Sequence, residues 1–353
     1  MNIKNKHLSL PLIQGGMGVG ISLGNLAGNV GKCGGMGVIS TADIGFKEPD
    51  FWQNPLAANV RALKKEIKKA QDIACGNGLI AINAMVATVQ YPQMVQAAIE
   101  ADIDCIISGA GLPTKLPELA GDSNAAIAPV ISSAKAAGTI CKMWDRRYQR
   151  IPDFMVLEGS LAGGHLGFGE DALKNGTTEP LETLLPAVLK AIEVYAEKYN
   201  TEIPVFVAGG IDNAEEIEKF IQMGAAGVQI ATKFIPTIEC DAAEGYKQAF
   251  LTAKKEDIRI VKSPAGMPGR ALWTPLMQNV EAQGRIAPKK CINCLVPCDT
   301  GKSPYCITEA LIGAALGDYE KGLFFCGANA YKLDKITTVP EVLDELLPQW
   351  RNK

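Results

Sequence analysis

Residues 204–232 read PVFVAGGIDNAEEIEKFIQMGAAGVQIAT, and this stretch predicts one strand–helix–strand unit. Its two ends are short apolar runs rich in β-branched residues, each next to glycine or proline. Between them, Asn213 to Met223 has helical periodicity, with an asparagine where the helix begins and Gly224 where it ends. Strands that are apolar throughout, without alternation of polar and apolar residues, are typical of a parallel sheet covered by helices.

The same unit recurs along the first two thirds of the chain. Eight apolar runs are bounded by Gly, Pro or Asn: PLIQ at 11, MGVIS at 36, LIAIN at 79, IDCIIS at 103, AIAPVIS at 126, FMVLE at 154, PVFVAGG at 204 and AGVQIAT at 226. Helical periodicity separates them, most clearly at Pro55 to Ala74 and at Leu181 to Tyr199. Eight alternating units predict an α/β fold, a TIM (β/α)8 barrel. An open, doubly wound parallel sheet is the alternative.

The pattern changes past about residue 250. The rhythm of strands stops, Pro and Gly become frequent in KSPAGMPGRALWTP, and five of the ten cysteines fall between 291 and 326. We therefore predict two parts, a barrel over residues 1–250 and a smaller, mostly helical, Cys-rich C-terminal region over residues 251–353.

Composition narrows the class of ligand. Hydrophobic residues make up 47% of the 353 residues and charged residues 21%, as in an ordinary globular protein. The net charge is -3 and no dense Lys/Arg stripe occurs, which argues against nucleic acid or an anionic membrane as partner and favours small molecules. The sequence shows neither a signal peptide nor 18 consecutive apolar residues, so we expect a cytoplasmic protein. In a reducing compartment, cysteines are buried thiols, metal ligands or catalytic groups.

The loops after the last two predicted strands have the composition of an anion site. In a TIM barrel, the active site lies at the C-terminal ends of the strands, and a phosphate site often lies after strands 7 and 8. Gly209 and Gly210 would let backbone N–H groups approach a ligand, and the helix that begins at Asn213 favours an anion. Thr232 adds a hydroxyl after the last strand. These loops predict a phosphorylated ligand; the alternative is that the glycines only make tight turns.

Other predicted strand ends also bear polar or glycine-rich groups. In QGGMG, the glycines around Met17 would let a flat ring lie against the backbone, and Asn83 can donate and accept along the edge of a heterocycle or simply cap its strand. The stretch EGSLAGGHLGFGED (158–171) places His165 on the loop after the sixth strand, where an imidazole acts as general acid or base near neutral pH. A structural or surface role is the alternative for His165. His7 is interpreted as a surface residue.

The C-terminal cysteines have the spacing of a ligand set. CINCLVPCDTGKSPYC gives C-x2-C-x3-C-x7-C, formed by Cys291, Cys294, Cys298 and Cys306. Four thiolates suit Zn²⁺ or an iron–sulfur centre, and the alternative is reduced thiols that pack a small domain. The cysteines of the first part are interpreted as core residues: Cys33, Cys75, Cys105, Cys141 and Cys240.

Five motifs in order resemble a known family: PLIQGGMGVGISLGNLAGNVGKCGGMGVIST, IISGAGLP, EGSLAGGHLG, VFVAGGI and GVQIATKF. Over about residues 8–235 the chain is similar to the nitronate monooxygenase (2-nitropropane dioxygenase-like) family and to the flavin-dependent type II enoyl-acyl carrier protein reductases. The resemblance implies a TIM barrel that binds one FMN non-covalently, without a separate dinucleotide-binding domain.

The resemblance also implies roles for individual residues. Gly16 and Met17 would lie by the isoalloxazine ring, Asn83 at its polar edge, and His165 would be the active-site histidine. The other cofactor-binding residues carried over by these motifs are Glu158, Gly163, Gly164, Gly209, Gly210, Gln229, Ala231 and Thr232. The chain departs from the family pattern in two places: Ala231 precedes Thr232 where the family commonly has glycine, and the Cys-rich region is not a general feature of the monooxygenases.

Three functions follow as hypotheses. The first is FMN-dependent oxidation of alkyl nitronates of the 2-nitropropane type with O2. The alternative is an NAD(P)H-dependent enoyl-acyl carrier protein reductase, which GAGLP at 109–113 favours, or an NAD(P)H:quinone reductase. The third is a non-catalytic flavin or metal sensor. An iron–sulfur cluster or Zn²⁺ at the cysteines would be an additional cofactor, and the oligomeric state does not follow from the sequence.

Overall fold

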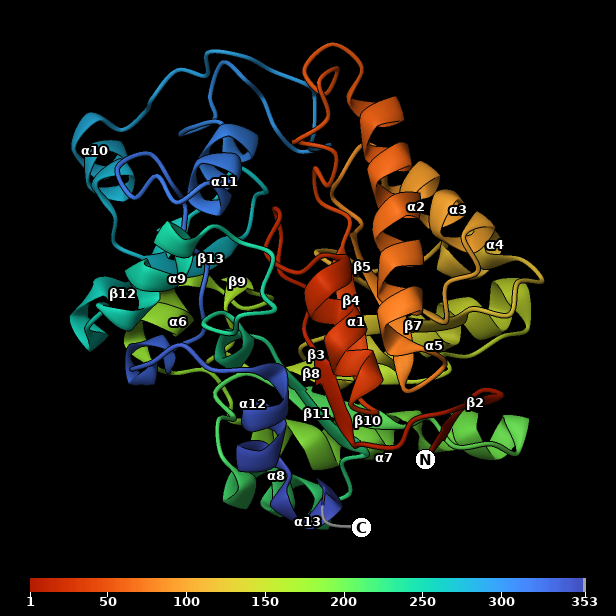
Figure 1. Cartoon of the computed structure of the whole chain (residues 1–353). Helices are drawn as coiled ribbons and strands as arrows, with labels where there is room; N and C mark the ends of the chain where they lie inside the picture. The colour runs from red at the N-terminus through yellow and green to blue at the C-terminus, as the bar shows by residue number, and fades with distance from the viewer. Residues whose placement is uncertain (352–353) are drawn as a thin grey trace.

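The protein is built on a closed barrel of eight parallel strands (Figure 1), seen in a computed structural model that describes residues 1–351. The strands are β3 (Leu12–Gln14), β4 (Met36–Ser40), β5 (Leu79–Met85), β6 (Cys105–Gly109), β7 (Ala126–Ile131), β8 (Met155–Glu158), β10 (Val205–Ala208) and β11 (Gly227–Ile230). They neighbour one another in chain order, and the pairing of β11 with β3 closes the ring. Each predicted apolar run forms one barrel strand, so the TIM-barrel prediction is confirmed and the open-sheet alternative is wrong.

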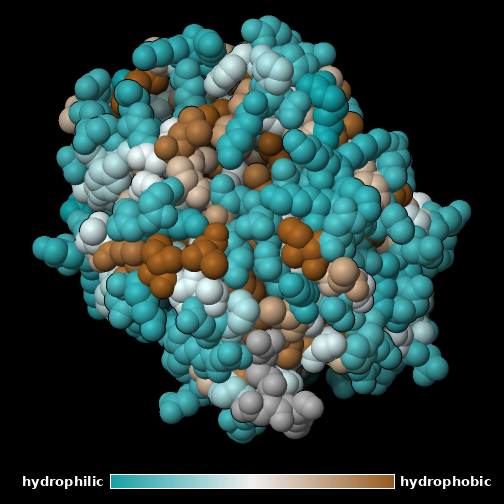
Figure 2. Space-filling view, viewed as in Figure 1, coloured by the Kyte–Doolittle hydropathy of each residue, from teal (hydrophilic) through white to brown (hydrophobic). Residues whose placement is uncertain are grey.

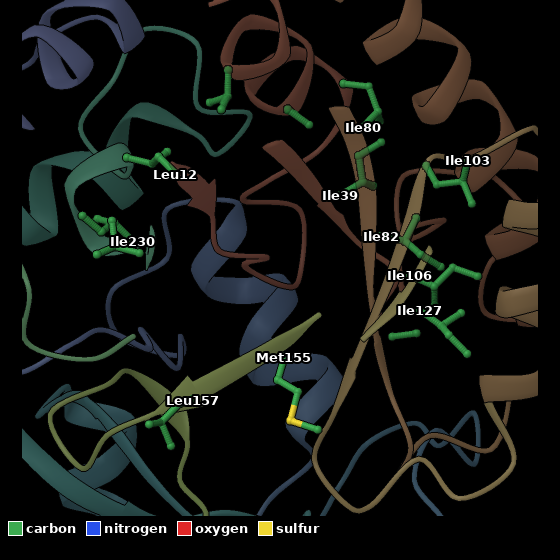
Figure 3. Packing of buried hydrophobic residues seen from close by; sticks show 14 of the residues in the cluster. Leu12, Ile39, Ile80, Ile82, Ile103, Ile106, Ile127, Met155, Leu157 and Ile230 are labelled. Atoms are coloured by element: carbon green, nitrogen blue, oxygen red, sulfur yellow. The ribbon is translucent and has the colours of Figure 1, made fainter. Parts of the chain in front are cut away.

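Both faces of the barrel strands are buried, which explains why the runs are apolar throughout. Alternate residues belong to two different core clusters. One cluster joins the strands to the surrounding helices, and Figure 3 shows its members Ile82, Ile106 and Ile127 side by side on three neighbouring strands. The other cluster fills the barrel interior and includes Ile13, Val38, Ala81, Ile107, Val156 and Phe206. The short hairpin of β1 (Asn2–Ile3) and β2 (Lys6–His7) adds Ile3, its second residue, and Leu8, which follows it, to this cluster.

Helices surround the barrel and follow the strands along the chain. They are α1 (Gly24–Lys32), α2 (Pro55–Ala74), α3 (Tyr91–Glu100), α4 (Leu116–Ala120), α5 (Ala134–Tyr148), α7 (Leu181–Tyr199) and α8 (Ala214–Gln222), with the short α6 (Glu170–Asn175) in the connection between β8 and α7. The predicted start of α8 is confirmed, because Asn213 caps it by accepting a hydrogen bond from the Glu216 N–H at 2.9 Å. Gly37 explains the glycine-rich second barrel strand: a Cβ there would lie 1.9 Å from the carbonyl oxygen of Ala27 in α1. Only glycine therefore lets α1 pack this closely on β4.

The C-terminal part contains helices and a hairpin. After the last barrel strand come η1 (Thr232–Phe234) and α9 (Glu244–Leu251). The elements that follow are η2 (Lys255–Asp257), β12 (Ile258–Lys262), β13 (Pro268–Leu272), α10 (Pro275–Gln283), α11 (Ile307–Ala315), η3 (Ala330–Lys332), α12 (Val339–Leu346) and α13 (Pro348–Arg351). The β12–β13 hairpin forms a three-stranded antiparallel sheet with β9 (Gly164–His165), which belongs to the loop after β8. In Figure 1 α12 lies close to α1 and α8, and its Val342 and Leu343 belong to the same core cluster as the barrel helices. A division of the chain at residue 250 stays a prediction.

Exposure separates the first-part cysteines that were interpreted as core residues. Cys105, Cys141 and Cys240 are buried, whereas Cys33 is half-buried and Cys75 is exposed at the end of α2. The core interpretation is therefore wrong for Cys75, whose position after the last turn of a helix places it at the surface. His7 is exposed, as predicted.

The outer surface is mixed in character. On the face shown in Figure 2, hydrophobic residues form separate groups among hydrophilic ones. None of the helices within residues 1–351 has the length and hydrophobicity needed to cross a membrane.

Candidate active site

A cavity of about 250 Å³ opens at the C-terminal ends of the barrel strands. The sequence-predicted catalytic and cofactor-binding residues all line it: Gly16, Met17, Asn83, Glu158, Gly163, Gly164, His165, Gly209, Gly210, Gln229, Ala231 and Thr232. They come from the ends of β3, β5, β8, β10 and β11 and from the loops that follow. The fold thus brings the whole set together, while the role of each residue stays a prediction.

His165 is held by groups outside the barrel. It pairs with Gly269 of β13, its ring meets the ring of Phe325 edge-on with centroids 5.0 Å apart, and its Nε2 lies 2.7 Å from the Ser263 Oγ. Burial disfavours the charged imidazole and lowers the pKa of His165 to about 4. The ring is therefore neutral at neutral pH, so it can hydrogen-bond a ligand without adding a positive charge to the cavity.

Glu158, at the end of β8, is the acidic group next to this histidine loop. Burial raises the pKa of Glu158 to about 8, although the nearby Arg270 opposes the shift. Arg270 is itself buried, and its guanidinium donates hydrogen bonds to the carbonyl oxygens of Ser160 at 2.7 Å and Ala162 at 2.5 Å. These bonds fix the loop between Glu158 and His165. The loop is glycine-rich yet well defined because Arg270 satisfies its carbonyl groups.

The loops after β10 and β11 form the other end of the cavity. Gly209 and Gly210 have φ angles of +102° and +85°, which favour glycine and turn the backbone across the cavity. The C-terminal segment covers this end: the Gly327 N–H donates to the Thr232 Oγ1 at 3.0 Å, and the Asn329 Nδ2 donates to the Gly210 carbonyl at 2.7 Å. The predicted anion site is therefore built from both parts of the chain.

The cavity has features that suit a flavin. The Gln229 Oε1 is buried without a hydrogen-bond partner among the described residues, so a ligand N–H or O–H would satisfy it. A Cβ on Gly164 would meet no atom within 4 Å, and this open space lies on the cavity wall. FMN carries a ring N–H, ribityl hydroxyls and a phosphate, which match an orphan acceptor, glycine-lined walls and the Gly209–Gly210 loop. The residues present therefore fit the cofactor that the sequence resemblance implies.

The sequence did not predict the cavity residues that come from the C-terminal part, nor that this part approaches the barrel loops. Apolar and aromatic side chains from this part line the cavity, namely Leu311, Phe325 and Leu333, together with Tyr246 of α9 just before it. Cys326, Gly327, Ala328, Asn329 and Lys332 also line it. The run CGANAYK carries small residues that permit close approach, as at Gly163, whose Cβ would lie 2.3 Å from the backbone of Cys326. Nothing in that run indicates which barrel loop it covers, so the sequence alone offered only a weak signal.

The four C-terminal cysteines of the proposed ligand set surround a separate cavity of about 20 Å³. The structure thus brings Cys291, Cys294, Cys298 and Cys306 into one neighbourhood. Within residues 1–351, however, no group of three or more His, Cys, Asp or Glu side chains is placed to hold a metal ion. The prediction of Zn²⁺ or an iron–sulfur cluster therefore has no support from the geometry, because ligands that share a wall of a cavity need not converge on one point.

A TIM barrel with a glycine-lined cavity and one histidine at its C-terminal mouth has the arrangement of the flavin-type TIM-barrel oxidoreductases. The model of the nitronate monooxygenase family matches residues 2–349. The chain belongs to the nitronate monooxygenase family, a family of oxidoreductase enzymes.

Similarity to individual proteins is more distant. Over 277 residues the chain is 26% identical to the (3aS,4S,5R,7aS)-5-hydroxy-7a-methyl-1-oxo-octahydro-1H-indene-4-carboxyl-CoA dehydrogenase of Mycobacterium tuberculosis, a match that covers 78% of the chain and 66% of that enzyme. It is 31% identical over 121 residues to a probable nitronate monooxygenase of Staphylococcus saprophyticus, covering 34% of the chain and 32% of the relative. The matched parts are thus just under two thirds and about one third of these relatives. FabK of Thermotoga maritima has the same fold, with a TM-score of 0.72, 23% identity, and coverage of 98% of this chain and 94% of that chain.

Proposed function

We propose that this protein binds one FMN in the barrel cavity and oxidises alkyl nitronates with O2. Two nitronate anions and one O2 would give two carbonyl compounds and two nitrite ions, so the reaction needs no nicotinamide. The observation that carries the proposal is a neutral imidazole, His165, beside apolar side chains in the cavity of a nitronate monooxygenase family member.

Residues of the first part would hold the cofactor. Gly16 and Met17 would lie against the flavin ring, the orphan Gln229 Oε1 would accept a hydrogen bond, and the Gly209–Gly210 loop with Thr232 would surround the phosphate. When bound, FMN would supply the capacity to accept electrons from the substrate and pass them to O2.

The substrate side of the cavity suits a small alkyl anion. Apolar walls from Met17, Leu311 and Phe325 would contact the alkyl group. A nitronate carries its negative charge mainly on the nitro oxygens, so it needs a hydrogen-bond donor and no base. The neutral ring of His165 has one N–H for this purpose. The side chains also exclude water from the reacting carbon, which strengthens that hydrogen bond.

A second candidate is an NAD(P)H-dependent reductase of enoyl thioesters. Two observations favour it: the segment 109–113, GAGLP, whose Gly109 and Ala110 line the cavity, and the similarity to a dehydrogenase whose name specifies a carboxyl-CoA substrate. In that reaction, His165 would donate a hydrogen bond to the thioester carbonyl or help to protonate the product.

An anaerobic titration separates the two candidates. The flavin absorbance of the purified protein is followed while NADH, NADPH and then an alkyl nitronate are added. We expect no change with either nicotinamide and bleaching with the nitronate, followed by nitrite release and O2 uptake when air is admitted.

Bleaching by a nicotinamide would contradict the monooxygenase proposal and direct the search to enoyl thioesters or quinones. A flavin that none of the three compounds reduces would contradict both candidates and favour a sensor. Free FMN under the same conditions is the control for direct chemical reduction.

A further inference from the structure

The two ring nitrogens of His165 have different surroundings. Nε2 lies 2.7 Å from the Ser263 Oγ. Nδ1 has no hydrogen-bond partner among the described residues. It is also absent from the fully buried polar atoms of this part of the chain that lack a partner, so it is open to the cavity. Since His165 lines the cavity, Nδ1 is the ring nitrogen left for a bound ligand.

The hydrogen bonds of Ser263 indicate the direction of the Ser263–His165 contact. Its Oγ accepts the N–H of Ala265 at 3.2 Å, so one acceptor position is filled. The Ser263 hydroxyl also has one proton to donate, and Nε2 is the acceptor that the described part of the chain provides. The contacts therefore favour donation from the hydroxyl to Nε2, with the second lone pair of the Ser263 Oγ left open. A neutral imidazole whose Nε2 accepts must carry its proton on Nδ1.

We propose that Ser263 is a positioning residue that fixes His165 as the Nδ1–H tautomer, so that the imidazole presents an N–H donor to the substrate. This inference rests on the proposed function for its catalytic meaning. It implies that His165 binds an oxygen atom of an already formed anion, because neither ring nitrogen is free to accept a proton. A neutral nitroalkane, which must first lose its α-proton, is then a poor substrate.

The position of Ser263 suits this role. It follows β12 directly, in the turn that leads to β13, and β13 pairs with the strand that carries His165. The ring of Phe325 packs edge-on against the imidazole. Ser263 and His165 are thus tied together by the backbone of one small sheet, and the hydroxyl sets the tautomer of a ring whose plane is already restricted.

The tautomer can be read directly because the chain has only two histidines. The flavin-bound protein is labelled with ¹⁵N-histidine, and a long-range ¹H–¹⁵N correlation spectrum at pH 7 shows which ring nitrogens carry protons. His7→Gln assigns the signals. We expect His165 as the Nδ1–H tautomer in the wild type and in Ser263→Thr, and a mixture or the Nε2–H tautomer in Ser263→Ala.

Kinetics then test the consequence. We expect Ser263→Ala to lower kcat with nitronate by about 10-fold, less than the 10²–10³ expected for loss of the hydrogen-bond donor itself, and Ser263→Thr to restore it. Unchanged flavin content and Tm exclude a folding defect; if Ser263→Ala fails to fold, Ser263→Cys, a weaker donor of similar shape, takes its place.

An Nε2–H tautomer in the wild type, or one that does not respond to removal of the hydroxyl, would overturn the inference. If the wild type turned over a neutral nitroalkane as fast as its nitronate, the role of His165 as a hydrogen-bond donor would be overturned. The spectra need no turnover, so they stand even if the nitronate activity is absent, in which case only the proposed function fails.

Discussion

At the scale of single residues, His165 and Glu158 are two titratable side chains that are both uncharged near pH 7. Burial keeps the imidazole neutral by lowering its pKa and keeps the carboxyl protonated by raising its pKa. Of these two groups, neither carries a full charge near pH 7, and each retains a proton to donate. A cavity of this kind binds an anion through hydrogen bonds, without a full positive charge from either of these two side chains.

The first prediction concerns removal of the imidazole. His165→Ala should keep its flavin, because His165 is not among the predicted cofactor-binding residues, but should lower turnover by about 10²–10³-fold, the usual cost of removing a hydrogen-bond donor from an anionic transition state. Flavin absorbance and initial rates of O2 uptake measure the two effects. His7→Ala, at an exposed position in the β1–β2 hairpin, is the matched control and should leave both unchanged. Full turnover by His165→Ala would remove this residue from the mechanism.

The second prediction concerns pH. Because the pKa of His165 is about 4 in the folded protein, kcat should stay flat between about pH 5 and 7, where an ordinary imidazole would titrate. Between about pH 6.5 and pH 4 the unfolded chain binds more protons at His165 than the folded chain, so the stability that His165 contributes is lost as the pH falls through this range.

A decrease of kcat near pH 8 should come from Glu158 and disappear in Glu158→Gln. A limb at pH 6.5 that His165→Gln abolishes would contradict the assignment.

At the scale of elements, the barrel could be predicted from the sequence because each strand is one apolar run between breakers. Both faces of a barrel strand are buried, so the run carries the signal by itself. The two-residue strand β9 could not be predicted in this way. Its partner β13 lies about a hundred residues along the chain, and no local pattern at His165 indicates pairing. The hairpin that supports the histidine is therefore set by tertiary contacts.

The third prediction tests the contact between α1 and β4. Gly37→Ala places a Cβ 1.9 Å from the Ala27 carbonyl oxygen, so α1 must move and the free energy of unfolding should fall by about 3 kcal/mol or more. Gly138→Ala, in the middle of α5, is the matched control because its Cβ would meet no atom within 4 Å. It should raise the stability by about 0.5–1 kcal/mol. Urea unfolding of both variants measures the difference, and equal stabilities would contradict the packing argument.

At the scale of the whole molecule, the cavity is assembled from both parts of the chain. The barrel supplies the glycine loops and the Glu158 carboxyl. The C-terminal part supplies the segment around Asn329, which lines the cavity, and Arg270 and Ser263, which hold the histidine loop from behind. The sequence pattern located part of the barrel set, such as His165 and Gly209, because strand ends converge in this fold, and the family resemblance supplied others, such as Gln229 and Ala231. Neither located the residues of the C-terminal part, because their contacts depend on how the last third of the chain folds back over the barrel mouth.

The fourth prediction tests this covering segment. Asn329→Ala removes a hydrogen bond to Gly210, which should weaken the docking of this segment by about 0.5–1.5 kcal/mol and raise the flavin dissociation constant by about 2–13-fold. Fluorescence quenching of added FMN by the flavin-free protein measures the change. Glu320→Ala, at an exposed site of the same region, should have no effect. Equal flavin affinities for Asn329→Ala and the wild type would show that the segment does not help to hold the cofactor site.

The pairing of β9 with β13 also determines when the cavity can form during translation. All eight barrel strands are made by residue 230, but the partner strand of His165 and the segment that reaches Gly210 are made later, up to about residue 330. At about 5–20 residues per second, translation of those hundred residues takes about 5–20 s. During that interval a nascent chain can have its barrel strands without a finished cavity mouth. The proposed flavin and substrate site is thus absent from incomplete chains and is complete only after the last third of the chain has been made.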